Sequence, residues 1–115
     1  MNEITIEADY IGKVLSVNHY KAFFRKKPEV KAWMDEIGWL LKGQGIDGWQ
    51  TPLTVTCDGR FRDRRSRPDL ANLSKVTLDA IQEGTGVNDR EMRWRDGLVS
   101  YGEPPVLWIT ITEAH

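Results

Sequence analysis

Two acidic residues, Asp69 and Asp89, each lie where a loop meets a regular element of structure. Asp69 follows an arginine-rich stretch at the expected start of a helix. Asp89 follows a glycine turn and precedes an expected strand, within the polar stretch 88–91. Carboxylate oxygens are ligands that Mg²⁺ prefers, and a bound Mg²⁺ activates water and stabilises charge on a phosphate. If the fold brings these two carboxylates together, the sequence predicts a metal site for phosphate chemistry.

The expected helix after Asp69 carries further polar side chains on one face. Asn72, Lys75 and Asp79 have i, i+3 and i+7 spacing, which puts them on the same side of a helix. A helix N-terminus favours an anion such as phosphate, and a lysine beside it can neutralise developing negative charge. Simpler interpretations stay open. Asp69 can cap the helix and Asp89 can cap a polar turn, while Lys75 and Asp79 can form an exposed ion pair of small energy.

Basic residues cluster in two stretches, although the formal net charge of the 115-residue chain is only −1. The first cluster is Arg60, Arg62, Arg64, Arg65 and Arg67, and the second is Lys21, Arg25, Lys26 and Lys27. Arginine pairs bidentately with phosphate oxygens, and clustered cations are typical of surfaces that bind nucleic acid. We call the segment 59–67 the arginine loop. Its residues expected to contact DNA are Arg62, Arg64, Arg65 and Arg67. The alternative is a solvated loop without a ligand.

Hydrophobic periodicity predicts the elements that position these residues. Strands are expected over residues 2–8, 53–57, 92–95 and 106–112, helices over 28–42 and 69–83, and loops over 16–27 and 59–67. The stretch 106–112 is apolar almost throughout, which is typical of a central strand. The order β-α-β-α-β-β fits a small mixed β-sheet with two helices packed against it. We therefore predict an α/β (α+β) fold in a single domain spanning residues 1–115.

Composition excludes several classes of protein. Hydrophobic residues make up 40% of the chain, with five tryptophans, so a folded core is expected rather than disorder. The single cysteine, Cys57, cannot form an intrachain disulfide or a structural zinc site, and its apolar neighbours predict a buried thiol. No window approaches the roughly 20 apolar residues of a membrane span, and the first residues do not resemble a signal peptide. A cytoplasmic protein without membrane association is expected.

The stretch from residue 69 to residue 89 resembles the signature of the RusA family of Holliday-junction resolvases. The residues that carry this resemblance are Asp69-Leu70-Ala71-Asn72-Leu73-Ser74-Lys75, then Asp79-Ala80, then Asp89. An early family element, Ser-x-Asn-x-Tyr, is similar to Ser16-Val17-Asn18-His19-Tyr20, and the family's last strand is similar to Ile109-Thr110-Ile111-Thr112-Glu113. The resemblance thus runs from about residue 4 to residue 113.

What the resemblance implies is a metal-dependent crossover junction endodeoxyribonuclease. Such an enzyme resolves Holliday junctions by paired phosphodiester hydrolysis in DNA recombination and repair, using Mg²⁺ (or Mn²⁺). The resemblance also implies a RusA-like homodimer that binds four-way junction DNA, in a bacterium or encoded by a phage. A twofold dimer would place two identical sites on a roughly twofold junction.

Residue by residue, the resemblance assigns roles to five positions. Asp69 and Asp89 become metal ligands, and Lys75 becomes the catalytic lysine. Asn72 becomes a supporting residue of the catalytic site, and Asn18 is expected near the DNA. Lys75 and the arginine loop are expected to contact DNA as well.

Ala71 departs from the family pattern, which typically reads Asp-x-Asp-Asn and places a further carboxylate at this position. Three interpretations follow. The site works with two carboxylates plus waters or a substitute such as Glu91 or Asp79; or the protein binds branched DNA without cutting it; or the alanine is an inactivating change. We favour natural tolerance of the alanine. A fourth, weaker interpretation is a small α/β protein whose carboxylates only form caps and ion pairs.

Overall fold

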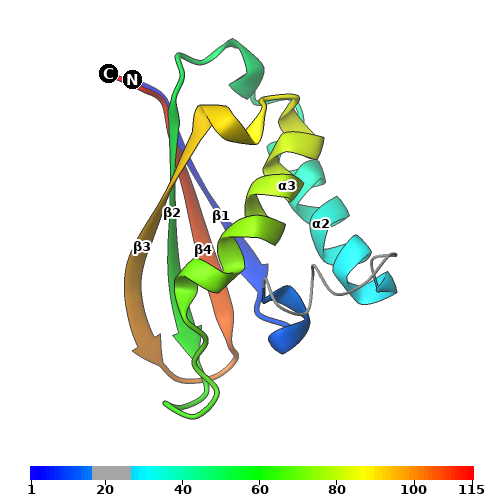
Figure 1. The fold of residues 1–115 in the computed structure, drawn as a ribbon, viewed down its shortest axis with the longest axis vertical. Coiled ribbons are helices and arrows are strands. Elements are labelled where there is room, and N and C mark those ends of the chain that lie inside the picture. Colours follow the sequence, from blue (N-terminus) through cyan, green and yellow to red (C-terminus); the bar gives the residue numbers. More distant parts are fainter. Residues whose placement is uncertain (17–26) are drawn as a thin grey trace.

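A mixed β-sheet of four strands carries the fold, and both described α-helices cover the same face of it (Figure 1). The computed structural model describes residues 1–16 and 27–115. The strands are β1 (Glu3–Asp9), β2 (Leu53–Phe61), β3 (Met92–Tyr101) and β4 (Val106–Thr112). The α-helices are α2 (Pro28–Leu41) and α3 (Ser74–Thr85), and the 3-10 helices are η1 (Lys13–Leu15), η2 (Ile46–Gly48), η3 (Leu70–Leu73) and η4 (Asp89–Glu91). The predicted α+β class is confirmed.

The order of strands across the sheet is β1-β4-β2-β3. Strand β4 is antiparallel to both of its neighbours, whereas β2 and β3 are parallel. The apolar stretch 106–112 is therefore an interior strand, as its composition predicts. Within the described residues β3 pairs with β2 alone, so β3 is an edge strand. Figure 1 also shows that the two chain ends lie side by side at one end of the sheet, where β1 meets β4.

Alternation along β2 separates the core from the open face of the sheet. Leu53, Val55 and Cys57 are fully buried beneath the helices, whereas the intervening Thr54 and Thr56 are only half-buried. Burial raises the pKa of the Cys57 thiol to about 12, because the charged thiolate would lose its hydration. The thiol therefore stays protonated at neutral pH, and Cys57 is a core residue as predicted.

Helices α2 and α3 approach each other through glycines. The periodicity of α2 buries Trp33 and leaves Trp39 on another face of the helix, with 70% of its surface exposed. Gly38 on α2 faces Gly84 on α3, and a Cβ on Gly84 would lie 2.7 Å from the Cα of Gly38. Contact between two backbones holds the helices at this crossing and fixes the inclination of α3 over the sheet.

Gly84→Ala should destabilise the fold, whereas Gly38→Ala should not. A Cβ on Gly84 meets backbone that must move, and overpacking of this kind costs about 1–3 kcal/mol. A Cβ on Gly38 would lie 3.5 Å from the Cα of Gly84, an ordinary contact, and alanine favours the helix by about 1 kcal/mol. Urea unfolding of the two variants measures the difference. Equal stabilities would contradict the close crossing.

Three boundaries differ from the prediction. The expected helix over 69–83 begins as η3 and becomes an α-helix only at Ser74. Strand β2 extends to Phe61, so the arginine-rich loop begins at Arg62 rather than at residue 59. Strand β3 extends to Tyr101 instead of ending near 95, because pairing with β2 resumes beyond a bulge.

The bulge in β3 is fastened by a side chain of β2. Asp58 Oδ1 accepts a hydrogen bond from the Leu98 backbone N–H at 2.7 Å. Gly97 lies against this carboxylate and against the Cys57 carbonyl oxygen, and a Cβ at position 97 would collide with both. The turn-like residues Asp96 and Gly97 therefore belong to a strand that bends, which no local sequence pattern indicates.

Candidate active site

Asp69 caps η3 at the end of the arginine loop. Its Oδ1 accepts a hydrogen bond from the Ala71 backbone N–H at 3.1 Å, and its carbonyl oxygen accepts one from the Asn72 N–H at 2.9 Å. These contacts agree with the simpler interpretation, in which Asp69 caps the helix. Its side chain remains exposed, while Asn72 is half-buried on η3.

A hollow of about 530 Å³ lies in front of the Asp69 side chain. The loop and η3 line one side of it, through Arg64, Arg67, Pro68, Asp69 and Leu70, and β3 lines the other side, through Asp96, Gly97 and Val99. Two carboxylates and two guanidinium groups thus face one space, which suits a phosphate together with a cation. The sequence did not indicate Asp96, because its place here depends on the β2–β3 pairing and the bulge.

Lys75, on the first turn of α3, joins two carboxylates. Its Nζ lies 3.1 Å from Asp79 Oδ1 and 3.9 Å from Asp89 Oδ2. The expected Lys75–Asp79 ion pair is confirmed, and Asp89 is added to it from across the fold. The backbone N–H of Asp89 donates to Gln82 Oε1 at 2.7 Å, which fixes η4 against α3. The side chains of Lys75, Asp79 and Asp89 are 41%, 20% and 39% exposed, so this cluster is reachable from solvent.

Asp69 precedes η3 and α3 in the chain, and Asp89 follows α3 as the first residue of η4. The structure brings Asp89 to Lys75, whereas no contact among residues 1–16 and 27–115 links Asp69 to Asp89. Ala71, which departs from the family pattern, is exposed on η3, between Asp69 and Lys75 in the sequence.

Carboxylates are suitable ligands for Mg²⁺, but those in the described residues do not form a complete coordination shell. Among the residues that the structure describes, no three His, Cys, Asp or Glu side chains come close enough to hold one metal ion. Mg²⁺ commonly binds through one or two carboxylates and keeps several waters. The Asp79–Asp89 pair and the Asp69–Asp96 hollow each offer two carboxylates. Asn18 lies outside the described residues.

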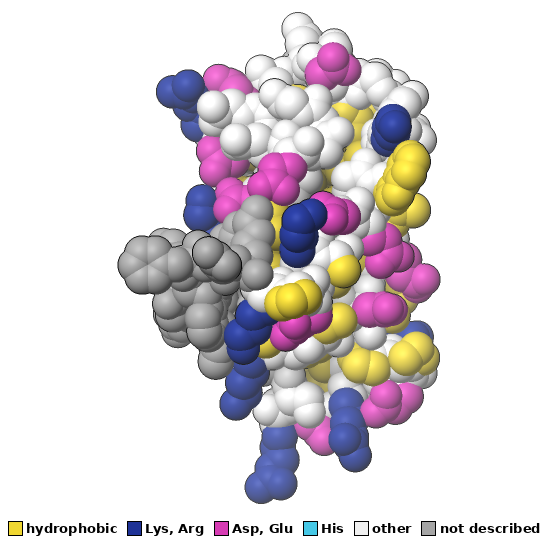
Figure 2. Space-filling model, turned by 90° about the vertical axis from the view of Figure 1, so that its right-hand side faces the viewer, with side chains coloured by type: hydrophobic (Ala, Val, Ile, Leu, Met, Phe, Trp, Pro, Cys, Tyr) yellow, Lys and Arg dark blue, Asp and Glu magenta, His cyan; other side chains and the backbone are white. Residues whose placement is uncertain are grey.

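The arginine loop is braced at both ends. Arg67 Nη1 donates to the Tyr101 hydroxyl at 3.1 Å, and Arg62 Nε lies 3.6 Å from Glu103 Oε1. Arg64 and Arg65 are exposed, and their side chains have no hydrogen bond or ion pair within the described part of the chain. Figure 2 shows Lys and Arg side chains at the lower end of the helical face, where this loop lies in Figure 1. The braced loop thus holds two unpaired guanidinium groups toward solvent.

A turn within the loop depends on Asp63. Its Oδ1 accepts hydrogen bonds from the Ser66 N–H at 2.8 Å and the Ser66 hydroxyl at 2.9 Å. These bonds hold the pKa of the Asp63 carboxyl below its ordinary value, because they stabilise the ionised form. The loop therefore has a preformed turn rather than a free chain between its braced ends.

A family model described as "Endodeoxyribonuclease RusA" matches residues 13–112, a span that contains the hollow, the Lys75 cluster and the arginine loop. The chain belongs to the RusA endodeoxyribonuclease family. This confirms the resemblance found in the sequence, and the mixed sheet with two helices agrees with it. Membership of the RusA endodeoxyribonuclease family supports a nuclease.

A curated relative shows a second similarity. The RusA-family chain is 28% identical over 99 residues to an ADP-specific phosphofructokinase from Thermococcus litoralis. The alignment covers 81% of this chain and 22% of the relative, so the chain spans less than a quarter of that protein's length. The activity of the whole kinase does not carry over on so small a share. Among the described residues, no helix has the length and apolar character needed to cross a membrane.

Proposed function

We propose that the protein is a metal-dependent endonuclease that resolves four-way DNA junctions. The observation that supports it best is the Lys75–Asp79–Asp89 cluster, placed within a chain of the RusA family. A solvent-accessible lysine between two carboxylates adds little to the stability of the fold, since exposed ion pairs contribute at most about 1 kcal/mol. The same grouping suits phosphate chemistry, in which a metal ion and a lysine share the negative charge.

Each side chain has a role in this proposal. Asp69 and Asp89 are the proposed metal ligands, and Asp79 is the carboxylate available to replace the one missing at Ala71. Bound Mg²⁺ (or Mn²⁺) would supply an activated water and a Lewis acid. Lys75 then neutralises charge on the phosphate or the leaving oxygen, and Asn72 supports the site beside Asp69.

The surroundings position these groups. Gln82 Oε1 accepts the Asp89 backbone N–H and so holds the backbone at Asp89 against α3. Arg64 and Arg65 hold backbone phosphates on the side of the hollow, where each neutralised phosphate strengthens the dependence of binding on salt. A homodimer would present two such sites to the two strands that must be cut, and twofold symmetry of the dimer would match that of the junction.

Binding of branched DNA without cutting is the second candidate function. It is favoured by Ala71, which cannot bind a metal, and by the Asp69 carboxylate, which serves as a cap. The arginine loop does not depend on these carboxylates, so DNA binding would survive the loss of catalysis.

A gel assay with a synthetic four-way junction and a linear duplex of the same sequence tests both candidates. In EDTA we expect a complex with the junction at protein concentrations that leave the duplex free. Addition of Mg²⁺ should then yield paired nicks in opposite strands. A junction that is bound but never cut, in Mg²⁺ or in Mn²⁺, would favour the second candidate. Equal affinity for duplex and junction would contradict both.

A further inference from the structure

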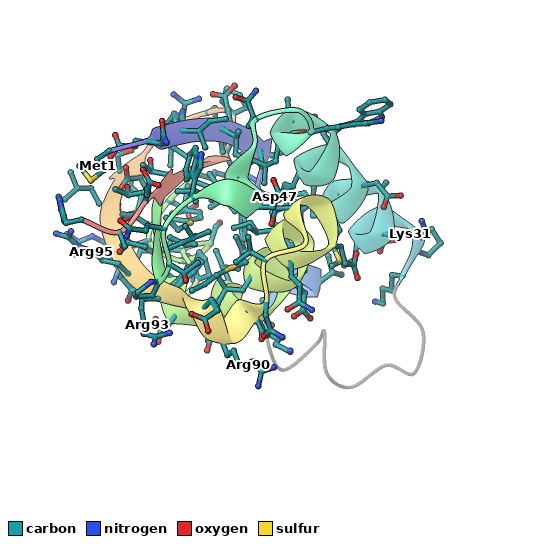
Figure 3. The ribbon with its side chains drawn as sticks, turned by 90° about the horizontal axis from the view of Figure 1, so that it is seen from above. Met1, Lys31, Asp47, Arg90, Arg93 and Arg95 are labelled. Carbon is teal, nitrogen blue, oxygen red and sulfur yellow. The ribbon has the colours of Figure 1, made fainter. Side chains whose placement is uncertain are left out.

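Three arginines outside the predicted site lie at the start of the edge strand. Arg90 belongs to η4, directly after Asp89, and Arg93 and Arg95 belong to β3. All three are exposed. Figure 3 shows them along one side of the molecule with their side chains directed away from the body. They form a basic surface, called the β3 arginine site below.

The guanidinium groups of this surface are available to a ligand. The side chains of Arg90 and Arg95 have no hydrogen bond or ion pair within the described residues. Arg93 Nη1 donates to the carbonyl oxygens of Arg90, at 2.7 Å, and of Met92, at 3.0 Å, which holds its side chain in place without neutralising it. The surface thus combines one fixed guanidinium group with two unpaired ones.

The neighbouring strand leaves the positive charge uncompensated. Arg93 and Arg95 pair in register with Thr54 and Thr56, which carry no charge. The carboxylates of two nearby acids already accept hydrogen bonds from residues of β3. The carboxylate of Asp96 accepts from Trp94 Nε1 at 2.7 Å, and that of Asp58 accepts from the Leu98 N–H.

Strand β3 connects this surface with the arginine loop. Its ten residues begin beside Asp89 and end at Tyr101, whose hydroxyl binds Arg67. A strand of that length spans about 33 Å, at roughly 3.3 Å per residue. One turn of duplex DNA rises about 34 Å, so cations at the two ends of β3 match the reach of a single turn. The residues of β3 that line the hollow, Asp96, Gly97 and Val99, lie between these two ends of the strand.

We infer that Arg90, Arg93 and Arg95 bind the phosphate backbone of a DNA arm on the Asp89 side of the site. The inference rests on the proposed action on DNA and adds a second grip, opposite the arginine loop. Alternate residues of a strand lie about 6.6 Å apart on one face, so Arg93 and Arg95 can reach successive phosphates of one strand. Charged side chains on an edge strand also prevent pairing with other chains, a role that the experiment separates.

The test compares two double variants for junction binding in EDTA over a range of salt concentrations. Arg90→Ala with Arg95→Ala removes two cations that support no internal contact. Lys31→Ala with Lys42→Ala removes two exposed cations from α2 and its end, and Figure 3 shows Lys31 on the opposite side of the molecule. We expect the arginine variant to bind at least about tenfold more weakly and to lower the slope of log affinity against log salt by about 1.8, or 0.9 for each phosphate.

The control variant should keep the wild-type slope. Arg90→Lys with Arg95→Lys should restore most of it, which excludes loss of folding as the cause. Equal slopes of log affinity against log salt for the arginine variant and the control would overturn the inference. A junction complex formed by the wild type in the same experiment would leave the proposed function intact. An unchanged slope with a shift in sedimentation assigns the surface to contact between chains instead. A wild-type protein that binds no DNA overturns both proposals.

Discussion

Asp89→Asn should lower Mg²⁺-dependent cleavage of a four-way junction by at least about 100-fold and leave junction affinity in EDTA within about twofold. Asparagine keeps the shape and the contact of the backbone with Gln82, but it removes the charge that would bind the metal and that faces Lys75. Loss of one group that stabilises charge in a transition state costs about 10²–10³ in rate. Single-turnover cleavage and gel binding measure the two quantities separately.

Asp47→Asn is the matched control for this experiment. Asp47 is an exposed acid on η2, and Figure 3 shows it away from Arg90 and the start of β3. Both its cleavage and its affinity should equal those of the wild type. Full activity of Asp89→Asn would remove Asp89 from the site, and a parallel loss of binding would show that the change had disturbed the fold.

Ala71→Asp should raise the cleavage rate at limiting Mg²⁺ by about tenfold or more. Position 71 is exposed, so the fold has room for the side chain, and it lies on η3, four residues before Lys75. An additional carboxylate there would extend the acidic cluster toward Asp69 and strengthen metal binding. It also lies near the N-terminal end of a helix, where a negative charge is favourable by about 0.3–1 kcal/mol.

Ala71→Asn separates the effect of charge from that of size. This variant has nearly the shape of the aspartate and should leave the Mg²⁺ dependence of cleavage unchanged. The rate is measured over a Mg²⁺ titration, because a better metal site lowers the concentration needed for half-maximal rate. If aspartate and asparagine give the same curve as the wild type, the chain has compensated fully for its alanine.

Local pattern was sufficient to predict most of the fold. The alternation of Leu53, Val55 and Cys57 gave a strand with the correct buried face, and the helical spacing from Val30 to Leu41 gave α2. Both patterns reflect burial against a core, which repeats with the period of the element itself. The second half of β3 was missed because Asp96, Gly97 and Leu98 do not alternate, and their pairing depends on the Asp58 side chain of another strand.

The sequence suggested candidate residues for the site, but it predicted little of how they are arranged in space. Lys75 and Asp79 were expected on one helix face, and their contact follows from helical spacing. That Asp89 joins them depends on the path of the chain after α3 and on Gln82, which no motif indicates. The Asp69–Asp96 hollow and the β3 arginine site arise from strand pairing, so they could be found only once β3 was in place.

The order of strands has a consequence for biosynthesis. Strand β4, the last of the four strands to leave the ribosome, lies between β1, the first, and β2. Strand β1 pairs with β4, so it lacks this hydrogen-bonding partner until residue 112 has emerged. Nascent chains that end before β4 should therefore remain sensitive to protease. Contacts so distant in sequence also slow the closing of the sheet.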